Sequence, residues 1–363
     1  MPAEPRTDTD TGPTLEEIVR IADAEGHSDV HLGVGEVPRY RANGDMQTTD
    51  WPISDQTSFD RWLREILTPQ QIDLFHREKE FDGSHAFPFV RIRINLLDSL
   101  RGPAMVLRLI PKTILTLEQL QLPAVLSELA GRPKGLILVT GPTGSGKSTT
   151  LAAMIDWINR NEARHILTIE DPVEFVHESR CSLIRHREVG VHTFQFHNAL
   201  RAALREDPDV ILVGEIRDRE TLSTALEAAQ TGHLVFGTLH TNSAVKTVER
   251  VLGMYPPDQQ SGICRSLAES LLGVIAQGLI RSNDGGRVAF HDILINTDAC
   301  KDYIQRGALE DVEEIMQRSS FDGMVTSNQS LQKLVEDGRV KGAEAVGVSL
   351  KPNELAQALR GRS

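Results

Sequence analysis

Near the start of the chain, apolar residues recur at the spacing of an amphipathic helix. Thr14 is a suitable N-cap, because its hydroxyl accepts from a backbone N–H and Glu17, three positions later, completes a capping box. The apolar positions that follow share one helical face, and they are Leu15, Ile18, Val19 and Ile21. The pattern predicts one helix that packs on a core through a single stripe.

Beyond this helix the apolar spacing changes to the alternation of strands. Basic and apolar residues alternate over 89–95. In 38–45 the alternation ends on Asn43-Gly44, a pair that favours a hairpin turn. We expect these segments to form a small α+β domain over 14–111, preceded by a disordered polar tail over 1–13.

The second part of the chain carries short, continuous apolar runs, mostly separated by helical stretches. Strands of a parallel sheet have this pattern, because helices cover both faces. We therefore expect an α/β domain over 124–363, with amphipathic helices after about residue 290 and a connector over 112–123. The expected strands are 135–140, 165–169, 210–213 and 233–238.

Composition narrows the classes of protein. A chain of 363 residues suggests two domains. Its net charge of −12 disfavours a nucleic-acid partner. No apolar run approaches the roughly 18 residues of a membrane span, and we see no secretory signal. The three cysteines are scattered and odd in number, so no metal knuckle or disulfide framework is predicted, which fits a reducing cytoplasm.

Residues 141–148 have the spacing of a phosphate-binding loop, or Walker A motif. The loop follows an apolar strand and precedes a helix, a context that distinguishes it from a glycine turn without nucleotide. We expect Lys147 to reach the β- and γ-phosphates of ATP and Ser148 to bind Mg²⁺. The sequence thus predicts an ATPase. Its expected ATP-binding residues are Gly141, Pro142, Thr143, Gly144, Ser145, Gly146, Lys147, Ser148 and Thr149.

Acidic residues follow two of the expected strands. Glu174 comes shortly after the second strand, and Glu215 follows 210–213 at a Walker B position. Ligands of open α/β sheets bind at the carboxyl ends of the strands, where carboxylates hold Mg²⁺ or activate water. For Asp218 and Glu220 we favour the simpler interpretation of solvated loop acids.

His233 and His240 lie at opposite ends of the last expected strand. A histidine there is able to sense the γ-phosphate or to form a hydrogen bond across a subunit boundary. The alternative is a structural histidine whose hydrogen bonds are satisfied locally. The position of His240 after the strand favours a functional role for it more than for His233.

Together these motifs resemble the secretion ATPase superfamily and, within it, the type IV pilus retraction ATPases called PilT and PilU. The resemblance covers about 14–345 and includes Arg91-Ile-Arg-Ile-Asn95 and Arg187-Glu-Val-Gly190. The motifs, in order, are Walker A at 141–148, an acidic box at 168–175, Walker B at 210–215 and a histidine box at 231–242.

The resemblance implies a PAS-like N-terminal domain joined to a RecA-like ATPase domain. It implies a homohexamer at the cytoplasmic face of the inner membrane, bound to the pilus platform protein, with or without a paralogous pilus ATPase. ATP would lie between the two domains and its turnover would rotate them. Glu174 would activate water and Glu215 would lie near Mg²⁺, although sequence alone does not separate these roles. Arginines are candidates to reach the nucleotide, or form a solvated strand face: Arg91, Arg93, Arg101 and Arg108.

One segment departs from the retraction ATPases. Ala299-Cys-Lys-Asp-Tyr-Ile-Gln-Arg306 replaces a segment tied to retraction, which sets this chain apart from the retraction motor proper. Residues 190–193 and 214–221 look closer to PilU and 235–241 closer to PilT, so the subtype stays open. The alternatives are a pilus-assembly or type II secretion ATPase, a DNA translocase on the same core, and an accessory ring subunit that binds nucleotide. Assembly ATPases usually have an additional N-terminal domain and many have a four-cysteine zinc site, which favours retraction.

Overall fold

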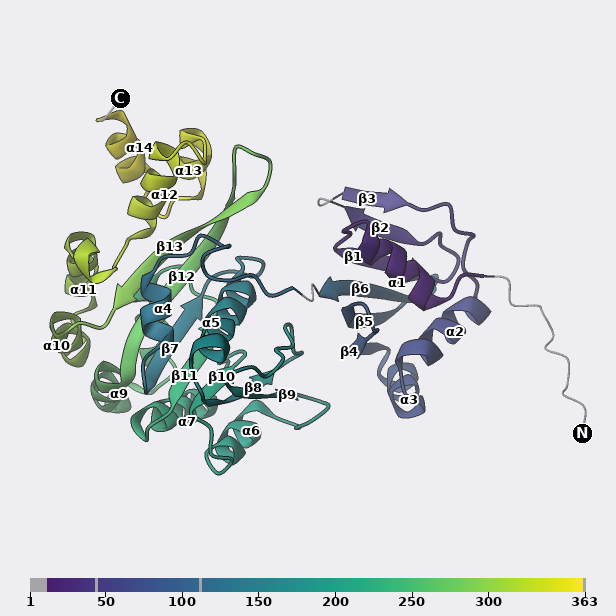
Figure 1. Cartoon of the computed structure of the whole chain (residues 1–363), viewed down its shortest axis with the longest axis horizontal. Coiled ribbons are helices and arrows are strands. Elements are labelled where there is room, and N and C mark those ends of the chain that lie inside the picture. Colours follow the sequence, from purple (N-terminus) through teal and green to yellow (C-terminus); the bar gives the residue numbers. More distant parts are fainter. Residues whose placement is uncertain (1–11, 43–44, 111–112, 362–363) are drawn as a thin grey trace, which may run out of the picture. The chain divides into compact units, whose positions relative to one another are not determined.

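The computed structural model describes residues 12–42, 45–110 and 113–361, and the chain divides into two compact units, Met1–Thr113 and Ile114–Ser363 (Figure 1). The expected turn at Asn43-Gly44, most of the expected tail and the start of the expected connector lie outside the described residues.

In its described residues, the smaller unit is an antiparallel sheet with three helices. Its six strands are ordered β3-β2-β1-β6-β5-β4. The elements are α1 (Leu15–Ala24), β1 (Asp29–Gly33), β2 (Arg39–Ala42), β3 (Asp45–Thr48), α2 (Gln56–Ile66), α3 (Pro69–Glu78), β4 (Glu80–Ala86), β5 (Arg91–Ser99) and β6 (Gly102–Ile110).

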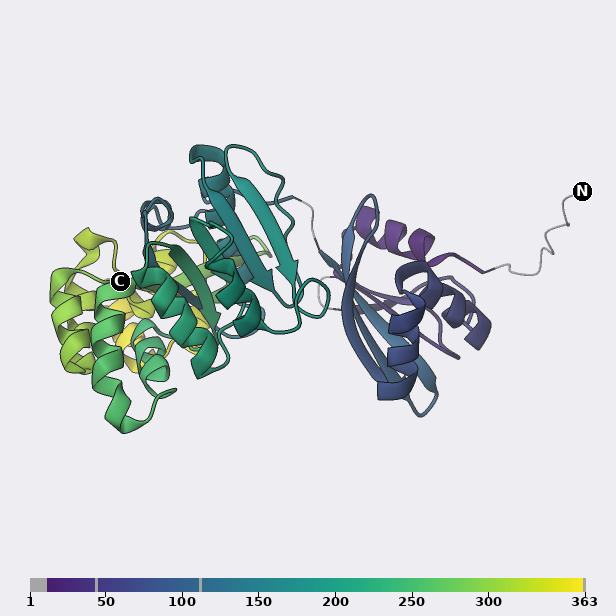
Figure 2. The same ribbon diagram turned by 90° about the horizontal axis from the view of Figure 1, so that it is seen from below.

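Helix α1 begins with the expected capping box of Thr14 and Glu17. Its buried face differs at one position from the prediction, because Ala22 lies in the core whereas Ile21 is 37% exposed. The three helices cover one side of the sheet (Figure 2), where their apolar residues form a single core with alternate strand residues. Pro13, expected in a disordered tail, accepts a hydrogen bond from Trp62 Nε1 at 2.9 Å.

The larger unit is a seven-stranded sheet covered by helices. Its strands are ordered β13-β12-β7-β11-β10-β8-β9, and β13 is antiparallel to β12 while the other neighbours are parallel. The first elements are α4 (Val125–Ala130), β7 (Gly135–Thr140), α5 (Lys147–Asn161), β8 (His165–Glu170), β9 (Leu183–Glu188), α6 (Phe196–Ala203), β10 (Val210–Val213), α7 (Arg219–Gln230) and β11 (Leu234–Leu239).

The remaining elements carry the chain to the sheet edge and into a helical end. They are α8 (Ala244–Leu252), α9 (Pro257–Ser270), β12 (Leu271–Arg281), β13 (Arg287–Ile295), α10 (Asp298–Arg306), α11 (Leu309–Arg318), a short 3₁₀ turn (Ser320–Asp322), α12 (Ser327–Glu336), α13 (Gly342–Val348) and α14 (Pro352–Arg360). Helices α12 to α14 pack with β12 and β13 around a small apolar cluster of their own.

Two apolar cores sandwich the larger sheet. Helices α4 and α5 cover one face, and α6 to α9 cover the other. The four expected strands are present: β7 and β10 have the expected bounds, β8 is one residue longer and β11 is shifted by one residue, whereas β9, β12 and β13 were not expected. Leu117, placed by the sequence in a connector, is buried in the core beside α4 and α5, so residues 114–123 pack with the larger unit.

Candidate active site

The phosphate-binding loop connects β7 to α5 through backbone conformations that favour glycine. Gly141, Gly144 and Gly146 have φ values of 144°, 78° and 86°. A Cβ on Gly141 would lie 2.2 Å from the Gln277 carbonyl oxygen, so no side chain fits there. Gly146 caps the N-terminus of α5, which directs free N–H groups and the positive end of the helix dipole toward the loop.

Lys147 is folded back onto its own loop. Its Nζ donates to the carbonyl oxygens of Gly141 at 2.7 Å and Pro142 at 3.1 Å. Burial lowers the pKa of Lys147, while the carboxylates of Glu174 and Glu215 act in the opposite direction. The fold therefore brings both predicted acids within electrostatic reach of this lysine, in a place where an anionic phosphate would be a stronger partner than two carbonyls.

Glu215 links the Walker B and histidine motifs. Its Oε1 lies 3.1 Å from His240 Nε2, and its Oε2 accepts from Arg217 Nη2 at 2.8 Å. The hydrogen bond from Arg217, with a smaller contribution from His240, lowers the pKa of Glu215. This carboxylate is therefore ionised at neutral pH, as a ligand of Mg²⁺ or of its bound water must be.

The loop that carries Glu174 is held by side chains of β9. Val173 N–H donates to Glu188 Oε2 at 3.1 Å, and His177 N–H donates to His186 Nε2 at 3.0 Å. Because Nε2 of His186 accepts, the ring proton lies on Nδ1, which faces Thr168 Oγ1 at 2.8 Å. The contacts present Glu174 on a fixed segment rather than on a free loop.

Gln277 of β12 is a residue of this site that the sequence analysis missed. Ala276 lies opposite Thr140 in the sheet, so Gln277 stands level with the first glycine of the loop. Its Nε2 donates to Ser145 O and its Oε1 accepts from Thr150 Oγ1, both at 2.7 Å. The available signal was a single amide inside a long apolar run.

Three other acidic and histidine residues of these motifs make local contacts or are exposed. His233 stands before β11, at the end opposite His240, and its Nδ1 is 2.9 Å from Ala228 O. Asp218 caps α7 by accepting from Thr221 N–H at 2.8 Å, and Glu220 is exposed. These contacts are those of structural or solvated residues.

The four candidate arginines all belong to the smaller unit. Arg91 donates to Ser84 Oγ at 2.7 Å, and Arg108 pairs with Asp29 at 2.9 Å. Arg93 lies opposite Arg108 in the β5–β6 ladder, and Arg101 is exposed between these strands. Three of them thus line the polar side of the sheet, away from its helix-covered core.

The donors around the loop fit a nucleotide with Mg²⁺. The Ser145 hydroxyl is buried without a hydrogen-bond partner in the described part of the chain, and the Ser148 side chain stands in the first turn of α5. Among the described residues, no three His, Cys, Asp or Glu side chains form a metal cluster. Mg²⁺ needs none, because it binds through one or two protein oxygens, phosphates and water.

The chain is similar to proteins of pilus and secretion machines. The model of a family described as "Type II/IV secretion system protein" matches residues 11–352. A twitching motility protein of Neisseria gonorrhoeae is 48% identical over 305 residues, covering 84% of this chain and 82% of that protein. The type IV pilus retraction ATPase PilT of Pseudomonas aeruginosa is 44% identical, covering 91% and 96%.

A solved structure supports the same relationship. A crystal structure of the pilus retraction motor PilT with bound ADP matches 95% of this chain and 99% of its own, with a TM-score of 0.89 and 41% identity. The likeness spans both units and supports the RecA-like ATPase core and its N-terminal domain. No helix in the ranges that the structure describes is long and apolar enough to cross a membrane.

Proposed function

This chain belongs to the type II/IV secretion system protein family, and from that premise we propose that it hydrolyses ATP to power the retraction of type IV pili. One observation carries the proposal. The larger unit gathers Lys147, Glu215 and His240 beside a complete phosphate loop, with Glu174 in electrostatic reach, in a chain 44% identical to a retraction ATPase.

Each residue is given a role that fits its position in the site. The loop N–H groups and Lys147 bind the β- and γ-phosphates, and Lys147 exchanges two carbonyl partners for them. Ser148 and the ionised Glu215 would hold Mg²⁺, which would neutralise phosphate charge. Glu174, on its fixed loop, orients the attacking water and accepts its proton. His240 reports the state of the site through its contact with Glu215.

The assembly remains part of the proposal. We place the chain in a homohexamer at the cytoplasmic face of the inner membrane, in contact with a platform protein of the pilus and with or without a paralogous ATPase. Arg91, Arg93, Arg101 and Arg108 are proposed to complete the nucleotide site, because guanidinium groups match the charge that develops during phosphoryl transfer. Turnover would then change the orientation of the domains.

Deletion of the gene in its host tests the direction of the motor. Loss of retraction predicts cells with more pili than the parent and without twitching motility. Cells without pili would contradict retraction and indicate an assembly ATPase. Normal pilus number with normal motility would instead indicate an accessory role, which the replaced segment Ala299–Arg306 makes worth measuring.

A further inference from the structure

The first turn of α8 receives hydrogen bonds from the end of the strand before the phosphate loop and from the histidine box. Thr247 is fully buried and donates to Ser243 O at 2.7 Å. A hydroxyl has one proton, so its oxygen accepts from Thr140 at 3.2 Å and from Thr241 at 2.7 Å. Thr140 ends the strand before the phosphate loop, and Thr241 follows His240. Hydrogen bonds therefore join this turn to the residue before the phosphate loop and to the histidine box.

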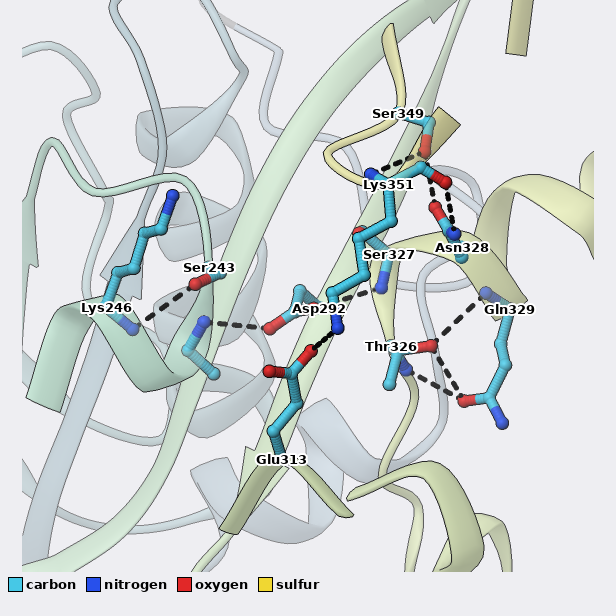
Figure 3. Close-up of polar contacts among 11 residues, drawn as sticks. Ser243, Lys246, Asp292, Glu313, Thr326, Ser327, Asn328, Gln329, Ser349 and Lys351 are labelled. Atoms are coloured by element: carbon cyan, nitrogen blue, oxygen red, sulfur yellow. Dashed lines mark hydrogen bonds and ion pairs between the residues drawn. The ribbon is translucent and has the colours of Figure 1, made fainter. Parts of the chain in front are cut away.

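The same turn is joined to the C-terminal helices by one carboxylate. Asp292 of β13 is buried, and its Oδ1 accepts from Ala244 N–H at 2.8 Å while its Oδ2 accepts from Ser327 N–H at 3.0 Å (Figure 3). These two N–H groups begin α8 and α12. Two helices that begin more than 80 positions apart in sequence thus have their N-termini on a single carboxylate. A negative charge there stabilises the positive ends of both helix dipoles.

Capping alone does not explain this arrangement. Helix α8 has its own cap, since Ser243 accepts from Lys246 N–H at 3.2 Å, and Thr326 caps α12 by accepting from Gln329 N–H at 3.3 Å (Figure 3). Asp292 adds what those caps do not provide, which is a rigid connection between the two helices. An ion pair of Lys351 and Glu313 lies next to this connection.

A second path reaches α12 from the opposite face of the sheet. His291 lies opposite Gln277 in the β12–β13 ladder, and its Nε2 is 3.2 Å from Gln277 Oε1. Gln277 holds the phosphate loop through Ser145. The backbone N–H of His291 donates to Ser330 Oγ on α12 at 3.0 Å. Asp292 and His291, neighbours in β13, therefore connect α12 to the first turn of α8 and to the phosphate loop, respectively.

We propose that Asp292 is a positioning residue of the ATPase, which holds the first turn of α8 against α12 and thereby couples the nucleotide site to helices α12–α14. The inference rests on the proposed function, because it assumes that nucleotide binds at the phosphate loop. Asp292 touches no nucleotide in this scheme. It acts by fixing the distance between two helix ends, so that the histidine box and α12 move together.

Hydrogen exchange of the full chain tests the coupling. The amides of α12 (Ser327–Glu336) are compared with and without Mg²⁺ and the non-hydrolysable analogue AMPPNP. We expect nucleotide to slow their exchange by about fivefold or more in the wild type. Asp292→Asn should lose most of this response, because an amide accepts at one oxygen only and turns a donor toward the other N–H group.

Two further variants separate coupling from stability. Thr247→Val removes the hydroxyl that joins α8 to both motifs and leaves Asp292 intact, so it should lose the response even if Asp292→Asn folds poorly. Thr326→Ala weakens the cap of α12 without touching either contact, so it should keep the response. In steady-state turnover, Asp292→Asn and Thr247→Val should lower kcat by about tenfold with little change in KM.

The outcomes distinguish this inference from the proposed function. A wild-type protein that hydrolyses ATP but shows no change in α12 on binding AMPPNP would overturn the coupling alone. The same holds if Asp292→Asn and Thr247→Val both keep the wild-type response, or if Thr326→Ala loses it equally. A wild-type protein that binds no nucleotide would overturn the proposed function, and this inference with it.

Discussion

Two carboxylates of the larger unit have opposite surroundings. Glu215 stands at the nucleotide site, partly exposed, and binds the side chains of Arg217 and His240. Asp292 is buried and binds only backbone N–H groups of two helices among the contacts above. Side chains rotate and exchange partners during a reaction, whereas helix termini do not. We therefore expect Glu215 to exchange partners during turnover, whereas Asp292 keeps the N-termini of α8 and α12 together.

The largest effect is expected at the phosphate loop. Lys147→Ala removes the ammonium group that, in the proposed site, binds the phosphates of ATP in place of two backbone carbonyls. The affinity for ATP should therefore fall by about 100-fold or more. Equilibrium binding of a fluorescent ATP analogue measures this. Lys246→Ala, on the surface of α8, is the control and should bind normally. Equal affinities for all three proteins would contradict the assigned nucleotide site.

A smaller effect separates chemistry from binding. Glu174→Gln keeps the shape of the side chain but removes its basicity, so hydrolysis should slow by about 100-fold while ATP affinity changes little. Single-turnover kinetics with Mg²⁺ and ATP show the difference. Glu178→Gln, an exposed acid on the same loop, should behave as the wild type. Full activity of Glu174→Gln would leave water activation to another residue.

The contacts of Asp292 with α8 and α12 should contribute to the free energy of unfolding. Asp292→Ala leaves two N–H groups without their partner, which we expect to cost about 3 kcal/mol in the free energy of unfolding. Thr326→Ala, which removes one partly exposed cap, should cost about 1 kcal/mol. Urea unfolding of the full chain gives both values. If the two variants lose the same stability, Asp292 is an ordinary cap.

The smallest effect is a difference in pH dependence. Arg217 holds the pKa of Glu215 below its usual range, so the stabilisation from Glu215 is present above the unfolded-state pKa and is lost as the pH falls through the lowered value. Burial raises the pKa of Asp292, although its backbone hydrogen bonds oppose this. Its contribution is therefore greatest below the unfolded-state pKa and is lost as the pH rises.

Melting temperatures measured from about pH 3 to 7 test these signs. The difference in Tm between wild type and Glu215→Gln should shrink toward acid, whereas the Tm of wild type relative to that of Asp292→Asn should fall as the pH rises. Slopes of the same sign for both variants would show that the two surroundings do not differ as described.

Local patterns were enough to predict four strands of the larger sheet and the phosphate loop, but not β9 or β12, which also contribute to the site. The phosphate loop has a fixed spacing, and Glu215 follows a buried strand after one glycine, so both are visible in the sequence. Gln277 and Asp292 were not predicted, because their partners are distant in sequence. Thr150, for example, lies 127 positions before Gln277. A lone amide or acid in an apolar strand reveals that it has a partner but not which one.

The boundary between the units shows a similar limit. The sequence predicted a connector over 112–123, yet Leu117 packs beside α4 and α5. Short segments with few apolar residues look alike whether they are free or packed, because burial depends on the surface they meet. Helix α1 shows the same limit, because the surface that it packs on buries Ala22 and leaves Ile21, the residue predicted to be buried, partly exposed.

Phosphate release by the purified protein tests the central claim most directly. Wild type, Glu215→Gln and Glu220→Gln are compared under saturating ATP with Mg²⁺. Glu220 is an exposed acid outside the site and serves as the matched control. We predict that wild type and Glu220→Gln release phosphate at the same rate and that Glu215→Gln is slower by about 100-fold. Equal release by all three proteins would contradict an ATPase built around Glu215.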